Sequence, residues 1–133
     1  MRDGKLTHRR TVKSGGDFPA SIAVSGRTVY VLNAGGTTNV TGFRLSRDGL
    51  RPLAGSTRKL GITNDAVPLF TDSPPQVGFS PDGRHLLYVQ NTLAGTIEGF
   101  RVGLDGELTL VETENEGLPV FADGSGMEGL VAW

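Results

Sequence analysis

The residues best suited to catalysis in this chain are two histidines, because an imidazole can take a proton from water near neutral pH. His8 lies in a polar stretch near the N-terminus, and His85 follows a turn at the beginning of an apolar run. Both positions are typical of a histidine at a surface or a strand edge. Neither is therefore a good general base, and the sequence leaves the catalytic residues unknown.

A glycine-rich motif lies near the C-terminus, where residues 124–129 match the dinucleotide-binding pattern GxGxxG. That pattern binds a pyrophosphate when a strand precedes it and a helix follows it. Here an apolar strand candidate, residues 130–133, follows instead. We interpret the motif as a loop, and we expect no cofactor.

Three acidic residues near the C-terminus form a small group. Glu112, Glu114 and Glu116 alternate, which places three carboxylates on one face of a strand. They have the chemistry to bind a cation, but like charges on an exposed strand more often prevent edge-to-edge pairing. The chain has no cysteine, which excludes disulfides and thiolate metal sites. We expect no metal.

The bulk composition excludes several classes of partner. The 133 residues are 37% hydrophobic and 20% charged, which is typical of a folded domain, and the net charge is −1. Such a balance provides no general field for nucleic acid or for an anionic membrane. No apolar run approaches the roughly 18 residues of a membrane span, and the polar N-terminus lacks the core of a signal peptide. The compartment stays undetermined between cytoplasmic and secreted.

Twenty glycines and seven prolines are spread along the chain and separate short apolar runs, which indicates a turn-rich all-β protein. A polar strand is expected over residues 8–14, and residues 15–19 are expected to be a loop. Further strands are expected over residues 21–24, 28–33, 39–45, 50–60, 76–79, 86–90, 96–102 and 107–114. A long connection over residues 61–75 divides them into two groups.

These groups are two copies of one unit. Gly26 and Gly83 are 57 residues apart, as are Phe43 and Phe100, and Tyr30 and Tyr88 are 58 apart. A period of about 45 residues with four strands, lengthened here by the long connection, is typical of a β-propeller blade. We divide the chain into the outer strand of a preceding blade (1–20), a first full blade with its connection (21–75), a second full blade (76–117) and the start of a further blade (118–133). Two full blades cannot close a ring.

Three phrases of the repeat resemble the seven-bladed propeller lactonase family, which includes the propeller type of 6-phosphogluconolactonase and the fungal muconate cycloisomerases. They are VYVLNAGG at residues 29–36, NVTGFR at 39–44 and PQVGFSPDGR at 75–84. The resemblance covers about residues 21–117. It implies hydrolysis of a sugar lactone, without a metal, in a cleft near the central channel. The family's histidine, acid and arginine have no matching positions in this sequence.

Ligands of propellers usually meet the innermost strands at the channel mouth. Ser21 and Gln76 stand at equivalent starts of these strands, each after a proline-containing loop, and are our candidates for substrate contacts. The alternative is that they only satisfy backbone groups of the loops. The repeated Phe43 and Phe100 are expected to fill the core between blades, and Arg44 and Arg101 to stay at the surface.

Two functions are compatible with this sequence. The chain is either part of a lactonase that acts on a 6-phosphogluconolactone-like substrate when the ring is complete, or a non-catalytic binding or scaffold module. In both cases an incomplete ring exposes the apolar faces of its outer blades, and we expect self-association through them.

Overall fold

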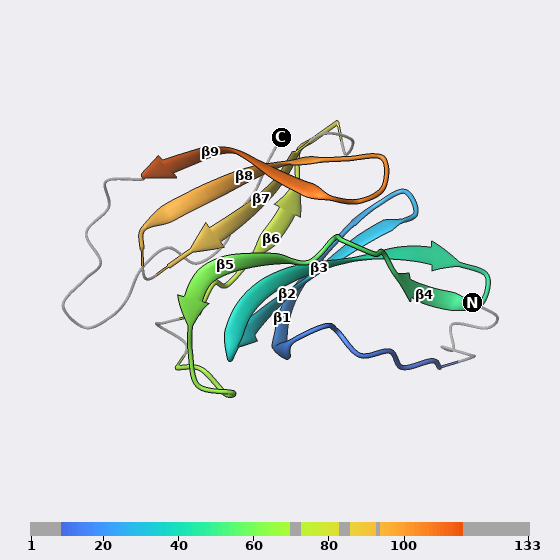
Figure 1. The fold of residues 1–133 in the computed structure, drawn as a ribbon, viewed down its shortest axis with the longest axis horizontal. Coiled ribbons are helices and arrows are strands. Elements are labelled where there is room, and N and C mark those ends of the chain that lie inside the picture. The colour runs from blue at the N-terminus through green and yellow to red at the C-terminus, as the bar shows by residue number, and fades with distance from the viewer. Residues whose placement is uncertain (1–8, 70–72, 83–85, 93, 116–133) are drawn as a thin grey trace, which may run out of the picture.

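The computed structural model describes residues 9–69, 73–82, 86–92 and 94–115 (Figure 1). These residues form two antiparallel sheets. The first contains β1 (Asp17–Ser25), β2 (Thr28–Gly35), β3 (Thr37–Ser46), β4 (Gly49–Pro52) and β5 (Arg58–Thr63). The second contains β6 (Val77–Phe79), β7 (Leu86–Asn91), β8 (Thr96–Val102) and β9 (Leu108–Asn115). No helix occurs in this part of the chain, and so none that could span a membrane. The predicted all-β class is confirmed.

The strand register confirms the repeat. Tyr30 on β2 lies opposite Gly42 on β3, and Tyr88 on β7 lies opposite Gly99 on β8. The two phenylalanines are equivalent in the same way, since Phe43 pairs with Val29 and Phe100 pairs with Leu87. The two sheets are therefore copies of one blade, and their corresponding faces can be compared residue by residue.

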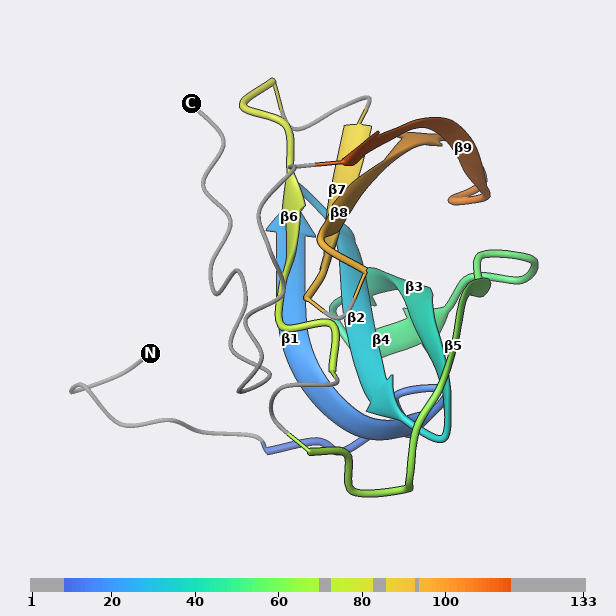
Figure 2. The same ribbon diagram turned by 90° about the vertical axis from the view of Figure 1, so that its left-hand side faces the viewer.

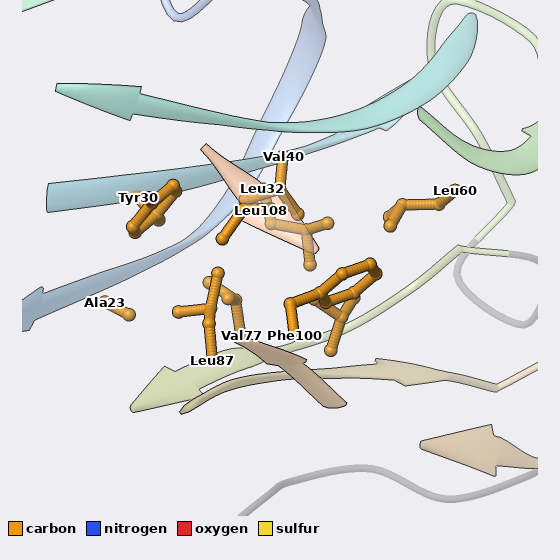
Figure 3. Packing of buried hydrophobic residues seen from close by; sticks show 10 residues of the cluster. Ala23, Tyr30, Leu32, Val40, Leu60, Val77, Leu87, Phe100 and Leu108 are labelled. Atoms are coloured by element: carbon orange, nitrogen blue, oxygen red, sulfur yellow. The ribbon is translucent and has the colours of Figure 1, made fainter. Parts of the chain in front are cut away.

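One hydrophobic core fills the space between the two blades (Figure 3). Alternate residues of a strand point to the same face of its sheet. Apolar residues at every second position therefore form one apolar face on each blade. The buried residues from the first blade are Ala23, Tyr30, Leu32, Val40 and Leu60, and those from the second are Val77, Leu87, Val89, Phe100 and Leu108. A second, smaller cluster of Val29, Val31 and Phe43 lies on the other face of the first blade. The middle strands are thus buried on both faces, which explains their near-continuous apolar sequence.

Tyr30 is the most specific link between the blades. Its side chain is completely buried, and its hydroxyl donates a 2.6 Å hydrogen bond to the carbonyl oxygen of Gly106, in the turn between β8 and β9. Its ring meets Phe79 edge-on, with 5.9 Å between the ring centroids. Burial, followed by the charge of Asp105, raises the pKa of Tyr30 to about 12. The tyrosine therefore stays protonated and keeps its hydrogen bond at every ordinary pH.

Three predicted strands differ in the structure. Residues 9–14, expected to belong to a polar strand, form no strand. Instead this segment lies against the first blade, where Arg10 donates to the carbonyl of Asp48 and the carbonyl of Ser14 accepts from Asn33. A segment that crosses the face of a sheet cannot join its hydrogen-bond ladder, which lies at the edge.

The other two differences concern the ends of the first blade. β1 begins at Asp17, inside the predicted loop, and continues past a register shift between Pro19 and Ser21. The single outer strand predicted over residues 50–60 is split into β4 and β5, which pair with opposite halves of β3. The division falls where Ser56 turns inward and its Oγ accepts the N–H of Gly42. One side chain here replaces a backbone partner that a continuous strand would have supplied.

Removal of the Tyr30 hydroxyl tests the link between the blades. We expect Tyr30→Phe to lower the free energy of unfolding by about 1 kcal/mol, because a buried hydrogen bond is lost and its acceptor is left unpaired. Urea denaturation measures this loss. Tyr88→Phe is the matched control, since within the described part of the chain the Tyr88 hydroxyl makes no such bond. Equal losses in the two variants would contradict the assignment.

Gly42 tests how closely the strands approach. A Cβ at Gly42 would lie 2.8 Å from the ring of Tyr30 and 2.9 Å from Cβ of Ser56, both fixed in the core. We expect Gly42→Ala to cost about 1–3 kcal/mol through overpacking, measured by thermal or urea denaturation. At the equivalent Gly99 the nearest atoms belong to the flexible Glu112 side chain. Gly99→Ala should therefore cost clearly less, and the reverse order would contradict the packing.

Candidate functional site

The first strands of the two blades, β1 and β6, run alongside one another (Figure 2). Of the two residues predicted at the channel mouth, Ser21 lies on β1 and Gln76 directly precedes β6. Ser21 pairs with Leu32, and the carbonyl of Gln76 accepts the N–H of Gln90, which occupies the place of Leu32 in the second blade. Ser21 and Gln76 are therefore equivalent in register, as predicted. The surrounding loops differ from the prediction, because Ser21 lies within β1 whereas Gln76 immediately precedes β6.

Ser21 connects the two first strands. Its Oγ accepts a 3.3 Å hydrogen bond from the backbone N–H of Val77. The hydroxyl is half-buried and holds the start of β6 against β1, which is the structural role named as the alternative in the sequence analysis. It still has a proton to donate, so a contact with a ligand stays a prediction for Ser21, as it does for Gln76.

Buried polar side chains gather at the same end of the blades. Asn33 Nδ2 donates to Asn39 Oδ1 at 3.0 Å, and Thr41 Oγ1 donates to the same oxygen at 3.0 Å. All three residues are at least nine-tenths buried. Asn33 Oδ1 and Gln90 Oε1 are buried oxygens without a hydrogen-bond partner in the structure. This polar end of β2, β3 and β7 is the part of the described chain best equipped with hydrogen-bonding groups.

This network was not predicted from the sequence, although the repeated Asn33 and Asn91 were a signal for it. Both follow an apolar strand at the same register, and both are buried. Their roles differ, because Asn91 Oδ1 accepts the N–H of Ala94 and closes the loop after β7. Asn39 and Thr41 also form the glycosylation sequon Asn-Val-Thr, and the burial of Asn39 makes it a poor acceptor for a glycan.

A cavity of about 790 Å³ opens between the blades at their opposite end. Its walls include Thr28, Arg44, Phe79, Asp82 and Gly106. Arg44 was expected at the surface, but it is half-buried and donates to Thr28 Oγ1 at 3.2 Å, whereas Arg101 is exposed as predicted. The cavity therefore offers the guanidinium of Arg44, the hydroxyl of Thr28 and the carboxylate of Asp82. These groups are suited to binding a polar ligand.

Glu98 is a partly buried carboxylate that has an arginine nearby. It lies on β8 and is half-buried, and burial raises its pKa, while the nearby charge of Arg58 opposes that shift. The Arg58 guanidinium in turn lies 5.8 Å from the centre of the Phe100 ring. An acid and an arginine are types that lactone hydrolysis uses. However, β8 and β5 are a third and an outer strand, so this pair lies away from the innermost strands.

The remaining candidates either lie outside the described residues or are exposed on β9. His8, His85, Glu116 and the glycine-rich motif of residues 124–129 lie outside the described residues. Glu112 and Glu114 are exposed on β9. Over the residues that the structure describes, no three histidines or carboxylates are grouped so as to hold a metal.

Comparison with solved structures identifies the fold. The chain is similar to a protein from Lactobacillus plantarum (22% identity, TM-score 0.57, 74% of this chain and 26% of that one). It is also similar to the periplasmic gluconolactonase of Pseudomonas aeruginosa (23% identity, TM-score 0.55, 72% of this chain and 27% of that one). No family model and no curated protein matches the chain.

The structure is therefore an incomplete β-propeller with a lactonase-like fold. The chain spans about a quarter of the length of the solved structures that it matches. The resemblance to propeller lactonases read from the sequence is thus supported by the arrangement of two consecutive blades.

The raised pKa of Glu98 leads to a test of its surroundings. A carboxyl whose pKa is higher in the folded state binds its proton more tightly there, so the fold loses stability as the pH rises through that pKa. Glu98→Gln mimics the protonated form. We expect it to raise the melting temperature at pH 7 and to give a smaller difference at pH 4, where the wild-type carboxyl is largely protonated.

Glu114→Gln on the exposed β9 is the control and should leave the melting temperature nearly unchanged at both pH values. A fall in the melting temperature of Glu98→Gln at pH 7 would mean that the attraction to Arg58 outweighs burial.

Proposed function

We propose that this chain is part of a propeller lactonase that hydrolyses a sugar lactone, of the 6-phosphogluconolactone type, when the ring of blades is complete. The observation that carries the proposal is the similarity of the two blades to the Pseudomonas aeruginosa gluconolactonase. In the reaction, water adds to the lactone carbonyl, and the ring oxygen leaves as a hydroxyl after it takes a proton, which gives the open hydroxy acid. The enzyme must activate the water and stabilise the negative charge on the carbonyl oxygen.

The two blades contribute binding groups in this proposal. Ser21 and Gln76 present a hydroxyl and an amide at the inner edge of the polar end, and such groups suit the many hydroxyls of a sugar lactone. The groove of about 600 Å³ between β1 and β6 is lined by residues 22–26 and 77–82, and its one charged side chain is that of Asp82. In this proposal the base and the oxyanion partner belong to other blades.

The second candidate is a non-catalytic propeller module that binds a ligand or a partner. One observation favours it. Among the described residues, no histidine, carboxylate and arginine converge on the groove between β1 and β6. A lactonase and a binding module differ in what the other blades place opposite Ser21 and Gln76 across the channel.

A pH-stat assay with 6-phosphogluconolactone and gluconolactone tests the proposal. We expect the 133-residue chain to hydrolyse neither above the spontaneous rate, because catalytic groups must be held within about 0.5 Å of their working positions and two blades leave the channel open. A chain that carries the further blades should hydrolyse at least one of them. In that chain Ser21→Ala and Gln76→Ala should raise KM more than they lower kcat.

Ser46→Ala is the matched control, since its hydroxyl bonds to Gly49 at the opposite end of the blade. An inactive ring that still binds the lactone would favour the binding module. Saturable hydrolysis by the 133-residue chain alone, lost on Ser21→Ala, would contradict our placement of the catalytic groups.

A further inference from the structure

The cavity of about 790 Å³ between the blades lies at the end opposite Ser21 and Gln76, and the proposed lactonase reaction does not use it. One wall comes from the turn between β1 and β2 together with the adjoining part of β3. The other comes from the turn between β8 and β9 and from the end of β6. Both walls are therefore present in the described blades. The volume is in the range of small-molecule sites in proteins.

Arg44 supplies the positive charge of this cavity. It lies two residues beyond Gly42 on β3, so it points to the same face of the sheet, toward the second blade. Its guanidinium is half-buried and donates a 3.2 Å hydrogen bond to Oγ1 of Thr28, which lies opposite it on β2. Among the described residues the ion pair joins Arg51 and Asp48, so Arg44 has no carboxylate partner there. Most of its N–H donors are thus available to a ligand.

The second blade shows that this arrangement is not a general feature of the repeat. Arg101 occupies the place of Arg44, but it lies opposite Leu86 and is exposed. Of the two repeated arginines, only Arg44 has a hydroxyl opposite it that holds the guanidinium in position. The cation is therefore placed specifically at the interface between the two described blades.

The rest of the lining suits a molecule that carries hydroxyl groups. Asp82 accepts a 2.5 Å hydrogen bond from Ser80 Oγ, and a carboxylate has the capacity to accept further bonds from hydroxyls. Phe79 and Val102 provide apolar surface for carbon-bound hydrogens. Gly26 has a φ of 56° and open space where a Cβ would be, so its turn leaves that side of the cavity unobstructed.

We propose that this cavity binds a small polyhydroxy carboxylate, with the carboxylate on Arg44 and hydroxyl groups on Asp82 and Thr28. A planar guanidinium matches a carboxylate through two parallel hydrogen bonds. A phosphate ester carries close to two negative charges at pH 7. It is disfavoured, because Asp82 lines the cavity and Asp105 lies in the adjoining turn. Binding here does not depend on lactonase activity.

Titration of the isotope-labelled chain with sodium gluconate, followed by amide NMR at constant ionic strength, tests this site. We expect a Kd on the order of 1 mM, as for a ligand held by one ion pair and a few hydrogen bonds. The amide signals of Gly26, Gly103 and Gly106, which line the cavity, should shift. Acetate, which has the carboxylate alone, should bind several-fold more weakly. Sorbitol, which has the hydroxyls without the carboxylate, should leave these signals in place.

Substitutions separate the contribution of each group. Arg44→Gln should weaken gluconate binding about tenfold or more, because hydrogen bonds to a charged group are lost. Arg101→Gln, at the equivalent exposed position, is the matched control and should leave the affinity unchanged. Arg44→Lys keeps the charge without the paired geometry and should bind with intermediate affinity. Asp82→Asn should weaken the binding of gluconate but not that of acetate. Melting temperatures of all four variants show whether a loss of binding is only a loss of folding.

Three results would overturn the proposal. The first is an unchanged gluconate affinity in a folded Arg44→Gln or Arg44→Lys chain. The second is a set of shifts at Gly36, at the polar end of the blades, without shifts around the cavity. The third is inorganic phosphate that binds at the cavity as tightly as gluconate, which would show a site for anions in general.

Discussion

Each blade of this protein has two apolar faces, and the fold depends on covering both. Tyr30 shows how the covering is achieved. The ring fits over Gly42, meets Phe79 edge-on and delivers its hydroxyl to the carbonyl of Gly106. These contacts come from three separate parts of the chain, so they fix the spacing of the blades and not only their attraction. A purely aliphatic core would have left that spacing less defined.

The same constraint separates the two ends of the blades chemically. The core occupies the middle of the strands, so polar side chains that must be buried are pushed to the strand ends. There Asn33, Asn39 and Thr41 hydrogen-bond one another in place of water. A group of donors and acceptors that is already held in place costs little to organise around a ligand. For this reason we propose ligand contacts next to the polar end, whereas the interface at the middle of the strands stabilises the fold.

The sequence predicted the class, the two copies of the blade and the equivalence of Ser21 with Gln76, because repetition at a fixed spacing records register directly. The strand predictions failed where a local sequence pattern was compatible with two structures. Residues 9–14 have the composition of a polar strand, but only the fold decides whether they join an edge or cross a face. The break between β4 and β5 depends on Ser56, whose Oγ accepts from Gly42, and no periodicity reports such a contact. The buried Asn33 network was equally hidden, since burial of a polar residue follows from its neighbours in space.

The cost of burying a charge is a reason to place the proposed catalytic base outside the interface between these two blades. Glu98 lies in the interface, where burial raises its pKa and works against ionisation. A catalytic carboxylate that must activate water needs the opposite, an ionised form that faces solvent and substrate. An ionised base buried in an interface between two blades would therefore cost the fold stability. In the lactonase that we propose, the base projects into the channel from a strand end, where one side chain can meet water on one side and protein on the other. The polar end of the blades, with Ser21 and Gln76 at its inner edge, is where such a residue from another blade would find binding partners.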